Sequence, residues 1–163
     1  MNARTPAAAS ARNQAEKYLT FRLRDESCAV PVLKVCEIVQ IREAITPVPQ
    51  MPDYVRGVIN LRGRLIPLID LRARFQLGAV TDTVQICTIV VQACDSRIGG
   101  VVDGVEEVIA ITADEISPPP NFGAAATPEY LLGMARTRGG IKCLLDLDRV
   151  ISSETLVRLS AAT

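Results

Sequence analysis

The chain has 163 residues, of which 48% are apolar, and its 18 Lys plus Arg residues balance 18 Asp plus Glu residues. It contains no histidine, which excludes histidine-based acid–base catalysis, histidine-activated nucleophiles, histidine metal ligands and phosphohistidine transfer within this chain. Zero net charge disfavours nucleic-acid binding, and the lack of a long apolar run disfavours a signal peptide or membrane insertion, so we expect a cytoplasmic protein.

The first predicted elements are an N-terminal tail and a hairpin. Residues 1–16 are rich in Ala, Ser, Arg and Asn, which favours a flexible tail; the alternative, an amphipathic helix that binds a partner, lacks a consistent apolar stripe. From Tyr18 to Leu23 apolar and polar residues alternate, and a polar turn leads to a second apolar run from Cys28 to Val32. This pattern predicts a β-hairpin.

Seven further segments combine β-branched residues with flanking turn residues, which is typical of strands. They cover residues 55–61, 65–71, 84–94, 98–103, 107–111, 132–137 and 141–147. Helices are expected to be few and short. Val32, Val35 and Val39 share one helical stripe, and Ser152 or Ser153 can cap a final helix. The predicted fold class is therefore mostly β.

A repeat relates the two halves of the chain. Residues 52–71 align without gaps with residues 128–147, at an offset of 76, and eight of the twenty positions are identical. Upstream segments align at offsets of 70 and 71. We therefore expect two copies of one module, over about 18–80 and about 84–151, followed by a helix over about 152–160. A module of this size forms a small barrel of about five strands, and two barrels together bury faces that neither covers alone.

The cysteines and glycines give no indication of a cofactor or metal. The five cysteines (Cys28, Cys36, Cys87, Cys94 and Cys143) include no CxxC pair of the kind that binds zinc. Each lies among apolar residues and is expected to be reduced and at least half-buried; the alternative is an exposed reactive thiol at Cys94, beside a polar turn. The glycines form no phosphate-binding pattern, so we predict no cofactor.

Asp70 and Asp146 occupy equivalent positions in the two repeats, as the paired carboxylates of aspartic hydrolases do. Such an active site needs small residues around each carboxylate, whereas both aspartates here are flanked by leucines. We therefore favour the interpretation that each aspartate bonds backbone at a strand end, and we predict no catalytic residue and no enzyme activity. An aspartyl hydrolase is the alternative.

Charge is distributed unevenly along the chain. Residues 54–76 carry five arginines and one acid, whereas residues 95–115 carry six acids and one arginine. These segments form either a mixed solvated surface or complementary contacts with other proteins. Arg62 stands beside Gly63 in a predicted turn, where its guanidinium can reach a partner's carboxylate; the alternative is a local ion pair with Asp53 or Glu37.

Four segments follow one another in the chain: YLTFRLRDESCAVPVLKVCEI, GVINLRGRLIPLIDLRARF, GGVVDGVEEVI and ISPPPNF. In series they resemble the CheW family of bacterial chemotaxis coupling proteins. The resemblance runs from about Tyr18 to Glu154 and implies two intertwined SH3-like five-stranded β-barrel subdomains in one CheW-like domain over about 17–160. It implies an adaptor without catalysis, monomeric alone and part of large arrays, that joins the cytoplasmic tip of methyl-accepting chemoreceptors to the regulatory domain of the CheA histidine kinase. A coupling protein of a related non-flagellar pathway, such as pilus motility or surface sensing, is the alternative.

The resemblance also implies two binding surfaces. By the match to LKVCEI and NLRG, the receptor-facing surface includes Val35, Glu37, Gly57, Asn60, Arg62 and Gly63. Contact with the kinase is expected in the second module, at Val101, Val102, Val105 and Phe122. The alternative for the valines is the protein core, because alternate residues of a strand face inwards.

Overall fold

The computed structural model describes residues 14–42, 45–77, 86–93, 95–119, 129–150 and 155. The strands are β1 (Glu16–Leu23), β2 (Glu26–Pro31), β3 (Val35–Ile41), β4 (Val55–Leu61), β5 (Arg64–Asp70), β6 (Ile86–Ala93), β7 (Ser96–Val101), β8 (Gly104–Ile111), β9 (Ile116–Ser117), β10 (Leu131–Thr137) and β11 (Gly140–Leu145). The helical segments are η1 (Val32–Lys34), α2 (Leu71–Arg74), η2 (Ala113–Glu115) and η3 (Leu147–Arg149).

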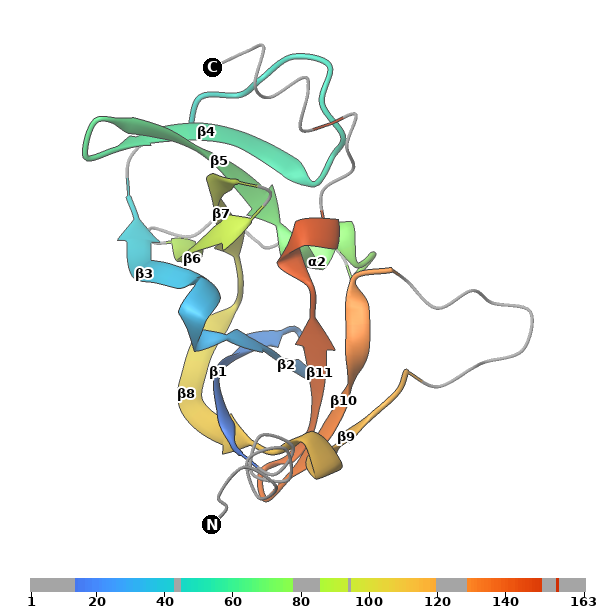
Figure 1. Ribbon diagram of the computed structural model, residues 1–163. Coiled ribbons are helices and arrows are strands. Elements are labelled where there is room, and N and C mark those ends of the chain that lie inside the picture. The colour runs from blue at the N-terminus through green and yellow to red at the C-terminus, as the bar shows by residue number, and fades with distance from the viewer. Residues whose placement is uncertain are drawn as a thin grey trace.

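The strands form two sheets that lie one above the other, with α2 where they meet (Figure 1). One sheet has six strands in the order β8-β1-β2-β11-β10-β9, and the other has five in the order β3-β6-β7-β5-β4. The predicted mostly-β class with two barrel-like halves is confirmed. The sixth strand of the larger sheet is the two-residue β9, which pairs with β10.

Each repeat contributes strands to both sheets. The hairpin β1–β2 of the first repeat joins β8 to β11 of the second, while β6 and β7 of the second join β3, β4 and β5 of the first. Two parallel pairings make these connections, Ala29 with Leu144 and Gly99 with Leu68, and they are equivalent under the repeat. The two halves are therefore intertwined, as the resemblance implied.

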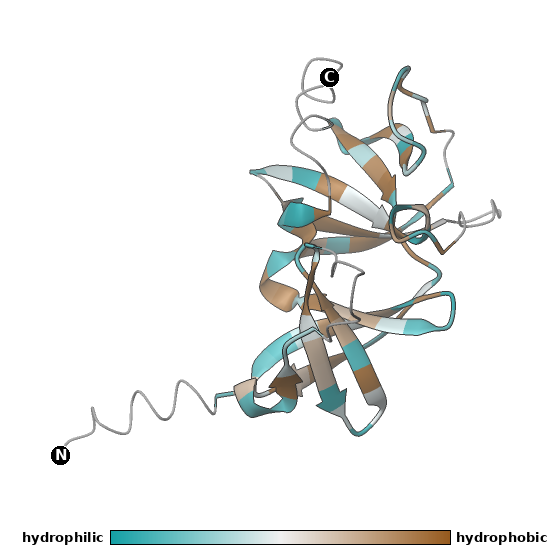
Figure 2. Cartoon of the chain, turned by 90° about the vertical axis from the view of Figure 1, so that its right-hand side faces the viewer, coloured by the Kyte–Doolittle hydropathy of each residue, from teal (hydrophilic) through white to brown (hydrophobic). Residues whose placement is uncertain are grey.

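Three apolar clusters fill this architecture. One lies within the five-stranded sheet and includes Leu68 and Val101, and another within the six-stranded sheet includes Tyr18 and Leu144. The largest cluster draws on both sheets and includes Phe21. Apolar and hydrophilic stretches alternate along the strands of both sheets in Figure 2. Burying apolar side chains on both faces of the central strands gives two small barrels a core that neither has alone.

One arginine joins the two repeats at the centre of the molecule. The Arg74 guanidinium lies 5.3 Å from the ring centroid of Tyr54 and 5.0 Å from that of Tyr130, which is the repeat equivalent of Tyr54. Its Nε also donates a hydrogen bond to the Val150 carbonyl, and Phe75 stacks on Tyr130 at 4.3 Å. Cation–π contacts and stacking of this kind orient the repeats relative to each other.

The structure corrects the predicted helical stripe. Val32 belongs to the short segment η1, but Val35 and Val39 lie on strand β3, which pairs antiparallel with β6. Along β3 half-buried and exposed side chains alternate, which is the period of a strand. The prediction was wrong because β-branched residues spaced for a helix stripe satisfy an edge strand equally well when a partner strand is present.

Some predictions fall outside the described residues. These are most of the tail, Cys94, Phe122 and the final helix over 152–160 apart from Thr155, whose side chain is buried. The tail was predicted to extend to residue 16, but β1 already begins at Glu16. None of the helices in the described ranges has the length and apolar character of a membrane span.

Candidate functional site

The turn between β4 and β5 presents Arg62 at its tip. Leu61 pairs with Arg64, so Arg62 and Gly63 form a two-residue loop, and their φ angles are 54° and 85°. Two consecutive left-handed residues define a type I′ hairpin, whose twist matches that of the strands. The Asn60 side chain supports the turn, because its Oδ1 accepts a hydrogen bond of 2.9 Å from the Gly63 backbone N–H.

Arg62 and Glu37 join the two edges of the five-stranded sheet. Nη1 of Arg62 donates to both carboxylate oxygens of Glu37, at 2.7 and 2.5 Å. Glu37 lies on edge strand β3, and Arg62 follows the opposite edge strand β4, so this ion pair, the Glu37–Arg62 clasp, closes the sheet on itself. The alternative of a local ion pair with Glu37 is confirmed, yet 73% of the Arg62 side chain stays exposed.

Gly57 does not lie on the exposed surface around Arg62. It is buried with a φ of 137°, and a Cβ added to it would stand 2.3 Å from the carbonyl oxygen of Thr46. That carbonyl accepts a 2.8 Å hydrogen bond from the Val58 N–H, which holds the incoming chain against β4. The expectation that Gly57 contacts a partner is therefore corrected: the residue lets two backbone segments approach closely. Asn60 and Gly63 are exposed, and Val35 is half-buried against the shared core.

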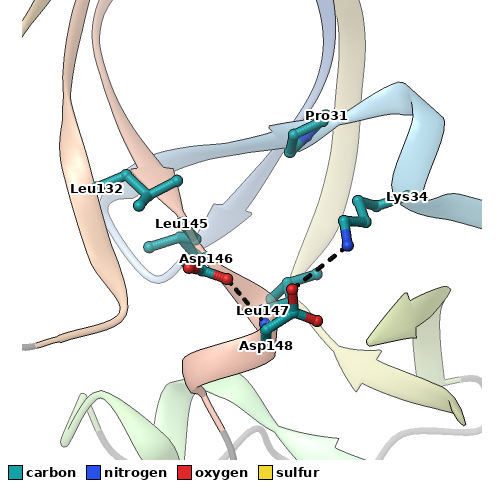
Figure 3. Close-up of a pocket in the computed structure, with 7 residues that line it drawn as sticks. All are labelled: Pro31, Lys34, Leu132, Leu145, Asp146, Leu147 and Asp148. Atoms are coloured by element: carbon teal, nitrogen blue, oxygen red, sulfur yellow. Dashed lines mark hydrogen bonds and ion pairs between the residues drawn. The ribbon is translucent and has the colours of Figure 1, made fainter. Parts of the chain in front are cut away.

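A groove with a volume of about 230 Å³ lies between the end of β2, η1 and the end of the second repeat (Figure 3). Its apolar lining comes from Pro31 at the end of β2 and from Leu132, Leu145 and Leu147 of the second repeat; the remaining lining residues are Lys34, Asp146 and Asp148. Lys34 and Asp148 form an ion pair of 3.4 Å across it, with about half of each side chain exposed. Because η1 leads directly into β3, the groove and the clasp lie along one continuous segment of chain.

Sequence reasoning missed this groove, although the repeat contains a signal for it. Leu132 is the equivalent of Arg56, and its side chain is 50% exposed. Leu33, beside Lys34 in η1, is 93% exposed and is the equivalent of Asp103. Where one copy has a charged residue and the other an exposed leucine, the substitution indicates a surface that contacts something other than water.

The second barrel, which is the six-stranded sheet, holds an open counterpart of the clasp. Under the repeat, Glu107 corresponds to Glu37 and Arg138 to Arg62. No ion pair joins Glu107 to Arg138 in the described part of the chain; both line a cavity of about 330 Å³, together with Glu115 and Ile109. One hairpin tip thus closes on its neighbouring strand, while the equivalent tip leaves its charged groups available to a ligand.

The residues expected at the kinase-facing surface divide between core and edge. Val101 lies inside the five-stranded sheet with 0% exposure, and Val102 lies in the shared core with 1%. The expectation that these two side chains touch a partner is corrected, because alternate residues of a paired strand and the residue after it face the two cores. Val105 is half-buried at the start of β8, and Phe122 lies outside the described residues.

Asp70 and Asp146 act as caps, as the sequence favoured. Asp70 accepts a hydrogen bond of 3.1 Å from the Ala73 N–H at the start of α2, and Asp146 accepts one of 3.0 Å from the Asp148 N–H in η3. Each carboxylate also has an arginine partner: Arg56 lies 3.4 Å from Asp70, and Arg149 lies 3.4 Å from Asp146. The two carboxylates therefore accept hydrogen bonds at separate strand ends, which belong to different sheets.

The described cysteines are free thiols in different environments. Cys28 is buried and Cys87 and Cys143 are half-buried, but Cys36 on the edge strand β3 is exposed, which corrects the expectation of burial for that residue. Burial raises the pKa of Cys87 above its usual value. No group of three or more potential metal ligands occurs in the described residues.

Comparison with known proteins shows which proteins have a similar sequence and fold. A family model described as the CheW-like domain matches residues 17–155. The chain is 35% identical over 141 residues to the chemotaxis protein CheW of Klebsiella aerogenes, covering 86% of this chain and 84% of that protein. It is 33% identical over 138 residues to protein FrzA of Myxococcus xanthus, with 81% of each chain covered. The crystal structure of the scaffolding protein TtCheW from Thermoanaerobacter tengcongensis superposes with a TM-score of 0.77, at 31% identity, over 87% of this chain and 96% of that one. The repeat, the exchanged hairpins and these matches together show that the chain belongs to the CheW family.

Proposed function

We propose that this chain is a cytoplasmic adaptor without catalytic activity, which couples the cytoplasmic tip of chemoreceptors to the regulatory domain of a CheA-type histidine kinase. The observation that carries the proposal is the divergence of the two repeats. Equivalent hairpin tips carry a closed ion pair at Arg62 and an open charged cavity at Arg138. Two similar barrels with chemically different surfaces suit an adaptor that holds two different partners.

The receptor surface in this proposal runs from the groove to the clasp. A chemoreceptor tip is a helical hairpin, and a groove lined by leucines accepts the apolar ridge of a helix. Lys34 and Asp148 at the groove offer one charge of each sign to polar groups beside that ridge. Val35, Glu37, Asn60, Arg62 and Gly63 continue the surface, and the exposed guanidinium of Arg62 fixes the position of the helix along it.

The kinase surface in this proposal lies on the second barrel. Val105 and Phe122 are its apolar contacts, and the cavity between Glu107 and Arg138 provides its charged contacts. Val101 and Val102 are buried in the two cores, directly before the turn into β8, which carries Val105. Depleted charge at the centre and a charged rim are typical of protein interfaces.

Coupling by such an adaptor needs no reactive group. Holding the receptor and the kinase on one protein raises the effective concentration of each for the other. A signal passes only when the two states of the receptor bind the adaptor with different free energies, so the contacts must discriminate as well as attach. Different surfaces on the two barrels also allow head-to-tail rings with kinase domains of similar shape.

Replacing Arg62 with histidine tests the receptor surface. Because the Arg62 side chain is exposed, its ion pair contributes at most about 1 kcal/mol to folding, so the variant is expected to stay folded. Loss of a charge-assisted contact predicts roughly tenfold weaker capture of a receptor tip fragment, with capture of the kinase regulatory domain changed by less than about twofold. Biolayer interferometry with each purified partner measures both values.

Arg138→His is the matched control, since it makes the same change at the equivalent tip of the second barrel. It is expected to leave capture of the receptor unchanged and to weaken capture of the kinase domain. Equal loss of both partners in Arg62→His, accompanied by a lower unfolding temperature, would assign Arg62 a structural role and contradict the receptor surface.

A coupling protein of a related non-flagellar pathway is the second candidate, because the matches include a protein, FrzA, that is not named as a chemotaxis protein. The same surfaces serve either pathway, so the partners must discriminate. Deletion of the gene, followed by separate assays of swimming and of surface motility, is expected to abolish swimming chemotaxis under the first candidate. A defect confined to surface motility would favour the second.

A further inference from the structure

We infer that Cys28 and Cys143 form a redox modification site, at which a hydroperoxide converts the two thiols into a disulfide that joins the repeats. Both residues are free in the structure. Cys28 lies on β2 of the first repeat and Cys143 on β11 of the second, and the two residues are direct partners in the parallel pairing of these strands. The inference stands apart from the adaptor proposal, because it uses none of the residues of the two proposed binding surfaces.

The geometry brings the two sulfur atoms to the same side of one sheet. Direct partners on neighbouring strands project from the same face, and neighbouring strands are about 4.8 Å apart, within the range of Cα separations that a disulfide spans. Both side chains contact the same apolar cluster, the shared core between the sheets. Oxidation therefore needs rotation of two side chains and no movement of strands.

The two thiols have different roles in the reaction. A hydrogen bond between the two side chains raises the pKa of Cys28 and lowers that of Cys143. Cys28 is buried with 3% exposure, whereas Cys143 is half-buried. Cys143 is thus the sulfur that an oxidant reaches first, and Cys28 is the thiol that resolves it.

The proposed reaction consumes one hydroperoxide. The Cys143 thiolate attacks an oxygen of hydrogen peroxide, the O–O bond breaks, hydroxide leaves and Cys143 becomes a sulfenic acid. Cys28 then attacks the sulfenic sulfur, its thiol proton passes to the departing oxygen as the S–O bond breaks, and the disulfide and one water form. Two thiols and one hydrogen peroxide give one disulfide and two waters, so two electrons pass from sulfur to oxygen. Reduction by a thiol restores the starting state.

The site is specific to one of the two equivalent strand junctions. Under the repeat, Cys28 corresponds to Ile98 and Cys143 to Pro67 at the β5–β7 junction, which therefore has no thiols. A disulfide between Cys28 and Cys143 links positions 115 residues apart and constrains the unfolded chain strongly. It is expected to raise the unfolding temperature by roughly 5 to 10 °C.

Peptide mapping of the oxidised full chain tests the inference. The protein is treated with hydrogen peroxide, remaining thiols are blocked with N-ethylmaleimide, and non-reduced digests are analysed by mass spectrometry. The expected product is an intramolecular Cys28–Cys143 peptide pair that has lost two hydrogen atoms and disappears after reduction. Wild-type protein suffices for this measurement, so it does not depend on the folding of a variant.

Single replacements provide the controls. Cys143→Ala is expected to abolish the linked peptides and the rise in unfolding temperature, whereas the exposed Cys36→Ala leaves both unchanged. Recovery of Cys28 and Cys143 as separate blocked peptides, under conditions that fully oxidise Cys36, would overturn the inference. So would linkage of Cys143 to other cysteines as often as to Cys28.

Discussion

Replacement of Gly57 with alanine is expected to destabilise the chain by about 3 kcal/mol, because a methyl group meets backbone atoms that cannot move away. The added Cβ stands 2.3 Å from the Thr46 carbonyl oxygen, and the φ of 137° is one that residues with side chains rarely adopt. The Thr46–Val58 pairing must then open, and β4 loses the segment that covers it. Urea unfolding followed by circular dichroism measures the change.

Two other glycines serve as controls for this prediction. Gly104 has no atom within 4 Å of an added Cβ and no positive φ, so Gly104→Ala is expected to change stability by less than about 1 kcal/mol. Gly133 is the repeat equivalent of Gly57; its Cβ would lie 2.6 Å from the Ser117 carbonyl oxygen, but its φ is not positive, so an intermediate loss is expected. A Gly57→Ala protein as stable as wild type would contradict the role assigned to Gly57.

The second large effect is expected at Asp70. The Asp70 side chain is 1% exposed and pairs with Arg56, which is itself 16% exposed. Asp70→Ala removes a buried carboxylate, its ion pair with Arg56 and the cap of α2, and the expected loss is about 3 kcal/mol. Thermal and urea unfolding at neutral pH measure it.

Asp146→Ala is the matched control, since the repeat supplies the same aspartate in a wetter setting. The position equivalent to Arg56 is Leu132, which cannot form an ion pair. Asp146 therefore pairs with Arg149, whose side chain is 59% exposed. An exposed pair and one capping bond together predict a loss of about 1 kcal/mol. Equal losses in the two variants would show that burial of the pair has no influence.

Much of the fold could be predicted because strand signals are local. β-branched residues bounded by turn residues identified the strands from β4 to β8 and both hairpins of the aligned repeat segments. The exchange of hairpins between the repeats was not visible in these residues, because two copies with the same alternation can pair within a copy or between copies. That part of the prediction came from the family resemblance.

The candidate site shows the same division between local and distant information. The turn at Arg62 was predictable from its neighbour Gly63, and Glu37 was one of two partners considered for it. The groove was not, because Lys34 and Asp148 are 114 positions apart and meet only when the repeats pack. The direction of side chains could not be predicted either. Val101 and Val102 are adjacent residues in an apolar run, and such a run does not show that each faces a different core.

The proposed adaptor is one small protein that holds two partners on separate surfaces. The direct test immobilises a receptor tip fragment, adds the kinase regulatory domain with and without this chain, and measures retained kinase domain by surface plasmon resonance. We expect retention only when the chain is present, and an affinity for the kinase domain that changes by less than about threefold when the receptor surface is saturated. Displacement of the chain from the receptor by the kinase domain would mean that both bind one surface, and it would contradict separate receptor and kinase surfaces.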